Sequence, residues 1–182
     1  IALIWLAVPL RFAKRIDEKK DRIFRMTAAV ILVGQYLSWI LYELATDRFD
    51  IKTSLPLNLC DFSNFLLAYL LITTNKKLFE VLYFWAVAGT LQSFVTPNIT
   101  FAFPHLEFWV FYIQHGGEVL VILYFVFVLK YRPLLMSAVK AYLWLLAFVA
   151  AVYLINLLLG SNYMFLMADT PQPSTITKMI AP

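Results

Sequence analysis

The sequence has little charge: Asp, Glu, Lys and Arg make up 14% of its 182 residues, whereas 62% are hydrophobic. Soluble globular domains carry about 25% charged residues, so this composition excludes that class. The single cysteine, Cys60, excludes an internal disulfide framework. The sequence also lacks a glycine-rich phosphate loop and a Cys/His metal-binding cluster. The short alternating segments typical of a transmembrane barrel are missing as well.

What the sequence does contain is a series of long apolar runs. Because a membrane-spanning helix needs about 20 mostly apolar residues, we predict an all-α fold, a polytopic transmembrane helix bundle of about six spans. It forms a single transmembrane domain over residues 1–182. The first run is too short to cross a bilayer, so we expect the sequence to begin inside a truncated first helix. The expected spans are residues 1–12, 23–44, 57–73, 78–96, 104–129 and 134–160, followed by a tail at 161–182.

The positive charge is concentrated between alternate spans. Of the 15 Lys and Arg residues, twelve lie within residues 11–25, 76–77 and 130–140. Since basic loops stay in the cytoplasm, we expect loops 11–25, 74–77 and 130–133 to be cytoplasmic and the tail to be non-cytoplasmic. Basic residues also pair with anionic lipid headgroups, so the net charge of +4 does not call for a nucleic-acid partner.

Polar residues within the spans fall at one height. Counting about 1.5 Å per residue from the nearest basic residue places each of them about 22 to 26 Å above the cytoplasmic boundary. Ionisable groups inside a membrane usually face a protein interior or a wet cavity. We therefore expect one polar layer in the outer half of a hydrocarbon core about 30 Å thick. Its members are Tyr42, Cys60, Gln92, His115 and Asn156.

This layer contains the residue types of a nucleophilic site. A cysteine becomes a nucleophile when a nearby base favours its thiolate, and His115 is the intramembrane base of suitable pKa. Glu118 lies one turn from His115 on the same helix face and is expected to hold the ring in one tautomer. Asparagine amides are candidate donors to an oxyanion. The further candidate substrate-binding or orienting residues are Asn58, Gln92, Gln114, Asn156 and Asn162.

Each of these residues also has a structural interpretation. Cys60 is then a small buried hydrophobic residue, and His115 is a histidine whose hydrogen bonds are satisfied by Glu118. Gln92 and Asn156 are then interhelical hydrogen-bonding residues. A metal site is disfavoured, because His105 and His115 are separated by about 15 Å on one straight helix. We therefore expect no metal and no cofactor.

Several strings resemble a known family. They are Leu55-Pro56-Leu57-Asn58-Leu59-Cys60-Asp61, Tyr83-Phe84-Trp85, Gln92 with Thr96-Pro97, Phe103-Pro104-His105, Gln114-His115-Gly116 and Asn162-Tyr163-Met164-Phe165-Leu166. In this order they resemble the YwaF-like family of small bacterial multi-pass membrane proteins. That family is similar to a eukaryotic membrane acyltransferase family that acts on ether phospholipids through a cysteine.

The resemblance implies roles for two residues. Pro56 and Cys60 match a Pro-x-x-x-Cys signature, which implies that Cys60 is the nucleophile, and Gln114-His115 matches a Gln-His signature, which implies that His115 is its base. The sequence departs from the family pattern at Gly117 and Glu118, where apolar residues are usual. The family also has a further helix beyond the position of Pro182. The resemblance implies a location in the plasma membrane, as a bacterial cytoplasmic-membrane protein.

The leading hypothesis is an integral membrane phospholipid acyltransferase that uses Cys60 and His115 near the outer leaflet, with membrane lipids as its partners. One alternative is a non-catalytic lipid- or solute-binding membrane protein or transporter component. A third reading is a structural subunit of a larger assembly, with partner subunits that cover exposed helix seams.

Overall fold

The computed structural model describes residues 17–95, 97, 99 and 103–167, and in this part of the chain every regular element is a helix. The expected all-α fold is therefore confirmed. The expected first span, 1–12, and residues 168–182 of the tail lie outside the described residues. The elements are α2 (Glu18–Ala45), α3 (Leu59–Thr73), α4 (Lys76–Val95), α5 (Leu106–Phe127), α6 (Leu135–Leu159) and the short 3₁₀ helix η1 (Tyr163–Phe165).

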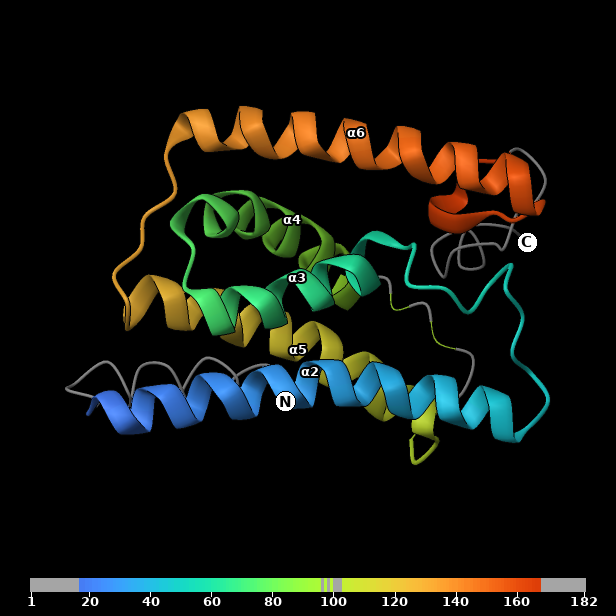
Figure 1. Ribbon diagram of the computed structural model, residues 1–182, viewed down its shortest axis with the longest axis horizontal. Helices are drawn as coiled ribbons and strands as arrows, with labels where there is room; N and C mark the ends of the chain where they lie inside the picture. The colour runs from blue at the N-terminus through green and yellow to red at the C-terminus, as the bar shows by residue number, and fades with distance from the viewer. Residues whose placement is uncertain (1–16, 96, 98, 100–102, 168–182) are drawn as a thin grey trace.

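Successive helices run antiparallel, so all the chain turns gather at two ends of the molecule (Figure 1). Helices α2, α3, α4 and α5 pack against one another, whereas α6 packs on α4 and η1. Helices α2, α4, α5 and α6 are long and apolar enough to cross a membrane, and α3, with 15 residues, is an apolar but shorter helix. In its most apolar stretch α5 is 50% buried and α6 only 11%, so α5 is the central helix and α6 a peripheral one.

The core consists of aliphatic and aromatic side chains from the four central helices. Leu67 and Leu70 of α3, Leu82 of α4 and Phe125 of α5 are completely buried. In a bilayer such side chains hold the helices together by van der Waals packing, because lipid tails are as apolar as leucine. The outward face of α6 is apolar and exposed, with Leu135 93% and Leu158 84% accessible, which is the pattern of a helix that faces lipid.

One end of the molecule, called here the basic end, carries Lys76, Lys77, Lys130 and Arg132. At this end the structure differs from the sequence prediction in the start of α2. Residues 18–25, expected as part of a cytoplasmic loop, form the first two turns of α2. The reason is local: Arg25 forms an ion pair with Asp21 one turn earlier, at 2.9 Å, and donates to the Leu71 carbonyl of α3, at 2.8 Å. Such a pair on one helix face supports helix formation.

The opposite end, called here the η1 end, is organised by residues 160–167 after α6, called here the return segment. Gly160 ends α6 with φ +61°, and the chain turns back over the start of α3. The Tyr163 hydroxyl donates to the Ile51 carbonyl, at 2.7 Å, and accepts from the Leu55 backbone N–H, at 2.9 Å. Burial raises the pKa of Tyr163, so the hydroxyl keeps the proton that this arrangement needs. The return segment thereby connects α6 to the loop before α3.

Candidate functional site

Cys60 is the second residue of α3 and lies half-buried against α4. The two helices meet at Gly89, where a Cβ atom would lie 3.8 Å from the Cys60 sulfur, an ordinary van der Waals contact. The polar side chains that interact with the thiol are Glu118, Asp61 and Ser93. The thiol therefore lies among polar groups from three helices, not in a purely apolar core.

Asp61, the next residue, is held by two amide donors. Its Oδ1 accepts from Gln114 Nε2 of α5, at 3.0 Å, and its Oδ2 accepts from Asn58 Nδ2, at 3.0 Å. Hydrogen bonds to a carboxylate are stronger than those between neutral groups. Asp61 also interacts electrostatically with His115. Asp61 was not among the predicted site residues, although an acidic residue inside an apolar run is a sufficient signal for one.

His115 is 6% exposed in the middle of α5, and its orientation is fixed from its own helix. The Nδ1 atom lies 2.8 Å from the Phe111 carbonyl oxygen, one turn earlier. A carbonyl can only accept, so Nδ1 carries the hydrogen and Nε2 of the neutral ring is the basic nitrogen. The ring also lies against the Phe111 ring, with centroids 4.2 Å apart. The neutral imidazole is thus held with its hydrogen on Nδ1 and with Nε2 unprotonated.

Glu118, which was expected to orient His115, has a different partner. Its Oε2 accepts from the Thr90 hydroxyl of α4, at 2.7 Å, and it is almost completely buried. Since the Phe111 carbonyl holds the imidazole, we revise the role of Glu118: it connects α5 to α4 beside the Cys60 thiol. The other carboxylate oxygen, Oε1, has no hydrogen-bond partner among the described residues.

The relation between the two expected catalytic residues is indirect. In the described part of the chain no hydrogen bond joins the Cys60 thiol to the His115 ring. Both side chains interact with the carboxylate of Asp61. The cluster therefore combines the half-buried thiol of Cys60 and carboxyl group of Asp61 with the buried imidazole of His115 and carboxyl group of Glu118. Direct proton transfer between the sulfur and Nε2 stays a prediction.

The remaining candidates divide into two groups. Asn58 and Gln114 converge on Asp61, and Asn58 also accepts from the Met164 backbone N–H, at 3.2 Å. Asn156 and Asn162 belong to the return segment instead. The Asn156 Nδ2 donates to the Tyr163 carbonyl, at 2.9 Å, so this amide is already used, and Asn162 Oδ1 accepts from the Met167 N–H, at 2.8 Å. Gln92 is exposed on α4.

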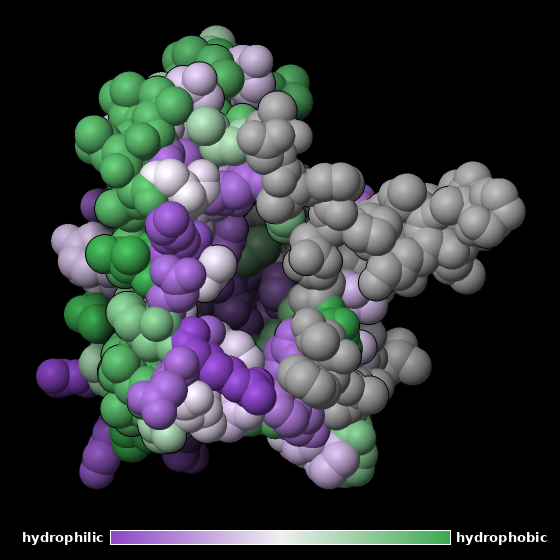
Figure 2. Space-filling view, turned by 90° about the vertical axis from the view of Figure 1, so that its right-hand side faces the viewer, coloured by the Kyte–Doolittle hydropathy of each residue, from purple (hydrophilic) through white to green (hydrophobic). Residues whose placement is uncertain are grey.

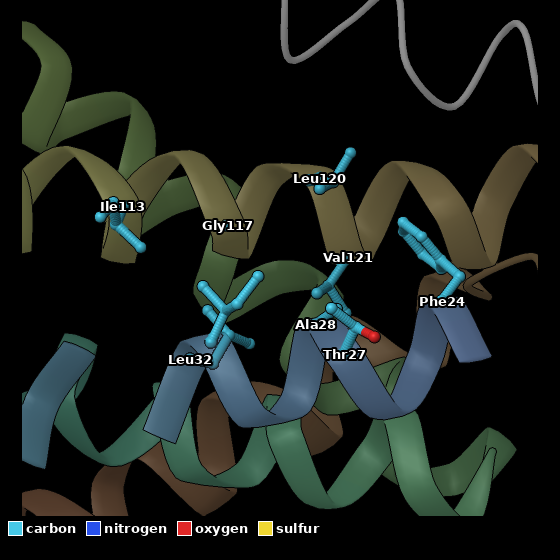
Figure 3. A pocket seen from close by; sticks show the side chains of 9 residues that line it. Phe24, Thr27, Ala28, Leu32, Ile113, Gly117, Leu120 and Val121 are labelled. Carbon is cyan, nitrogen blue, oxygen red and sulfur yellow. The ribbon is translucent and has the colours of Figure 1, made fainter. Parts of the chain in front are cut away.

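Helix α5, which carries His115, packs on α2 through a glycine. Gly117 faces Leu32, and a Cβ atom at this position would lie only 2.7 Å from Leu32 Cδ2 (Figure 3). The Gly116-Gly117 pair thus serves close helix packing, and α5 continues through it without a break. A cavity of about 260 Å³ lies along the same contact, lined by Phe24, Leu32, Gly117 and Val121 among others.

The η1 end is open on its polar side. Figure 2 views the molecule from this end and shows a hollow surrounded by hydrophilic residues, whereas hydrophobic residues cover the flank. Helix α3, with Cys60 in its first turn, begins at this end. The hollow is therefore at the same end of the bundle as the first turn of α3, which carries Cys60.

The comparison with known proteins identifies a family. The sequence profile of the TMEM164 family matches residues 1–181. The chain belongs to the TMEM164 family. Together with its membrane-length helices, this membership identifies a multi-pass membrane protein. No curated protein and no solved structure matches the chain.

Membership in the TMEM164 family confirms the membrane-protein part of the expected resemblance. The specific links to a YwaF-like family and to acyl transfer stay predictions.

Within the described ranges of this TMEM164-family chain, no three His, Cys, Asp or Glu side chains are arranged to hold a metal ion. His105 caps the start of α5 by accepting from the Glu107 N–H, at 3.2 Å.

Proposed function

We propose that this TMEM164-family protein is an integral membrane acyltransferase that moves an acyl group between phospholipids through a thioester on Cys60. The observation that supports this proposal is a group of electrostatically interacting side chains, a thiol, an imidazole and two carboxyl groups, inside a bundle of membrane-length apolar helices. Titratable groups gathered in one buried region are expensive to keep in a membrane and indicate a functional site.

In the first step the Cys60 sulfur attacks the ester carbonyl of a phospholipid while its proton passes to Nε2 of His115. The ester C–O bond then breaks, and the departing lysophospholipid oxygen takes the proton from His115. In the second step a lysophospholipid hydroxyl gives its proton to His115 and attacks the thioester carbonyl. The C–S bond breaks and the sulfur regains the proton. The two steps balance without an oxidant, a reductant or a cofactor.

The surrounding residues support the proton transfers. The Phe111 carbonyl keeps the hydrogen of His115 on Nδ1 and so leaves Nε2 as the base. A negative charge on Asp61 stabilises the imidazolium that forms when His115 takes the proton. We assign Asn58 and Gln114 to holding Asp61, because their amide groups donate to its two oxygens. Asn156 is left out of the mechanism, since its amide holds the return segment.

The test is acyl exchange in liposomes that contain the purified protein, a phospholipid with a deuterated acyl chain and an unlabelled lysophospholipid. Mass spectrometry then measures the labelled product. We expect Cys60→Ala to abolish exchange and His115→Gln to lower it about 10²- to 10⁴-fold, the range of general-base catalysis. Asp61→Asn is expected to lower exchange less, because it acts through His115.

Tyr153→Phe is the control, because Tyr153 lies exposed on α6. A thioester intermediate should also be released by neutral hydroxylamine in the wild-type protein. Full exchange by Cys60→Ser and Cys60→Ala would exclude the mechanism.

A polar-solute binding protein is the second candidate, favoured by a different observation. Among the described residues, three buried side chains carry polar atoms without a hydrogen-bond partner, namely Gln35, Asn64 and Glu118. Unpaired buried polar groups are rare and call for an explanation such as a bound molecule. Under this reading Cys60 is a packing residue, and the Cys60→Ala protein keeps its function.

We also propose a plasma-membrane location with the basic end in the cytoplasm. The concentration of Lys and Arg at the end that joins α3 to α4 and α5 to α6 supports this orientation. The cluster around Cys60 then lies toward the outer leaflet, where phospholipid esters are available as substrates.

A further inference from the structure

A second, apolar site lies on the opposite side of α3 from Cys60. Helices α3, α4 and α6 enclose a groove of about 540 Å³, within the range of about 300 to 1,000 Å³ that is usual for ligand sites. Its lining includes Phe62 and Leu66 of α3, Leu78 and Trp85 of α4, and Trp144 and Phe148 of α6. No residue of the proposed catalytic cluster lines the groove.

Two contacts of α6 with its neighbouring helices define the groove. The Trp85 Nε1–H donates to the Ala141 carbonyl, at 2.9 Å, which ties α6 to α4. The Phe148 ring stacks on the Phe62 ring of α3, with centroids 4.5 Å apart and an angle of 17°. The first contact fixes the distance between α4 and α6, and the second closes the groove at the level of the first turn of α3. The space between them is therefore part of the packed structure.

The residues that line the groove span a distance comparable to one leaflet of a bilayer. Phe62 lies 11 residues before the end of α3 at Thr73, which corresponds to about 16 Å along the helix. Half of a hydrocarbon core about 30 Å thick is about 15 Å. An acyl chain that enters at the basic end would thus run along α3 for about 16 Å, a little more than half of the hydrocarbon core, before it reaches the stacked rings of Phe62 and Phe148.

The mouth of the groove is positively charged. Asn75 and Lys77 line it at the basic end. In the described part of the chain the Lys77 ammonium group forms no hydrogen bond and no ion pair. Its neighbours are already engaged: Lys140 is paired with Glu80, at 3.2 Å, and Lys76 lies over the Tyr131 ring, 5.2 Å from its centroid. Glu80 also interacts electrostatically with Lys77, but its ion pair is with Lys140.

We propose that this groove binds one acyl chain of an anionic phospholipid, whose phosphate headgroup pairs with Lys77 at the basic end. The apolar lining fits the hydrocarbon chain, and the amide of Asn75 provides a further polar contact for the headgroup. The lipid is a bound structural or regulatory partner, and its site is independent of acyl transfer at Cys60.

The test is photo-cross-linking in nanodiscs. The probes are a phosphatidylglycerol and a phosphatidylcholine that carry the same diazirine-labelled acyl chain, and the labelled peptides are identified by mass spectrometry. In the wild-type protein we expect the anionic probe to label the α3 and α6 peptides around Phe62 and Trp144 about fivefold more than the zwitterionic probe, the factor expected for one basic residue beside an anionic lipid.

Two matched pairs of variants separate chain binding from headgroup binding. Ala147 lines the groove, so Ala147→Trp should fill it and lower labelling by both probes at least fivefold. Ala150→Trp, on exposed surface of the same helix, should label as the wild type does. Lys77→Gln should remove the preference for the anionic probe, whereas Lys76→Gln should keep it. Lys77 is exposed, so this arm remains decisive if Ala147→Trp fails to fold.

Three results would overturn the proposal. The first is equal labelling of the wild type by both probes, which would describe a site for any lipid chain. The second is unchanged labelling of a folded Ala147→Trp protein. The third is the absence of labelling of these peptides by either probe in the wild type, which would show that no lipid chain enters the groove.

Discussion

At the scale of the residue, Gly89 of α4 faces Cys60 of α3. A Cβ atom at Gly89 would lie 3.8 Å from the sulfur, so a methyl group fits beside the thiol without a shift of the helices. The thiol also interacts with Glu118 and Asp61, which come from two different helices. Since Cys60 is the only cysteine in the sequence, its reactivity can be measured in the intact protein without background.

Substitutions of Gly89 should show how much space lies between α4 and the Cys60 sulfur. A Cβ atom 3.8 Å from the sulfur is an ordinary van der Waals contact, so Gly89→Ala should leave the rate of N-ethylmaleimide labelling of Cys60 within about twofold of wild type. Gly89→Leu places a branched chain against the sulfur and should slow labelling at least tenfold. Cys60→Ser gives the background. Equal rates for Gly89→Leu and wild type would contradict the close approach of the two helices.

At the scale of the element, the contact between α2 and α5 depends on Gly117 and Leu32. Leu32 is 2% exposed and lies directly over Gly117, as Figure 3 shows. The turn of α5 that contains Gly117 also follows His115 and precedes Glu118. A change in this packing therefore shifts the turn that carries two members of the cluster.

Gly117→Ala should destabilise the protein, because the new methyl group would lie 2.7 Å from Leu32 Cδ2 and the leucine must move. We expect a loss of about 1 to 3 kcal/mol in the free energy of unfolding, the usual cost of overpacking. The measurement is reversible unfolding in mixed micelles. Leu32→Ala opens a cavity by itself, but in the double variant the two costs should partly cancel, with a coupling of about 1 kcal/mol or more. Strict additivity would show that the two residues do not touch.

The sequence predicted the helices better than it predicted which polar groups meet. Apolar length alone located α2 through α6, because a bilayer requires runs of about that length. Height along a helix, however, says nothing about the direction of a side chain. Asn156 has the expected height but bonds to Tyr163 in the return segment, and Glu118 bonds to Thr90, not His115. The role of Asp61 depends on Gln114 from another helix, which a single sequence does not reveal.

At the scale of the whole molecule, the two ends differ in charge and shape. The basic end has short connections and carries Lys76, Lys77, Lys130 and Arg132. The η1 end has the longer loop before α3, the return segment and the polar hollow of Figure 2. This asymmetry predicts a single orientation in the membrane.

The orientation can be measured with single cysteines introduced into a Cys60→Ser background. Arg132→Cys at the basic end and Lys52→Cys at the η1 end are both at exposed positions. In intact cells a membrane-impermeant maleimide should label Lys52→Cys and should label Arg132→Cys only after the membrane is permeabilised. The reverse pattern would invert the proposed topology and place the cluster near the inner leaflet.

The loose attachment of α6 has a consequence for how molecules reach the protein. Helix α6 packs on α4 and η1, and its contact with α3 includes the stacked rings of Phe62 and Phe148. The groove beside these rings adjoins the hydrocarbon interior, so its occupant arrives by lateral diffusion in two dimensions and does not cross water. Occupancy should therefore follow the mole fraction of the lipid in the bilayer and stay constant when the suspension of vesicles is diluted.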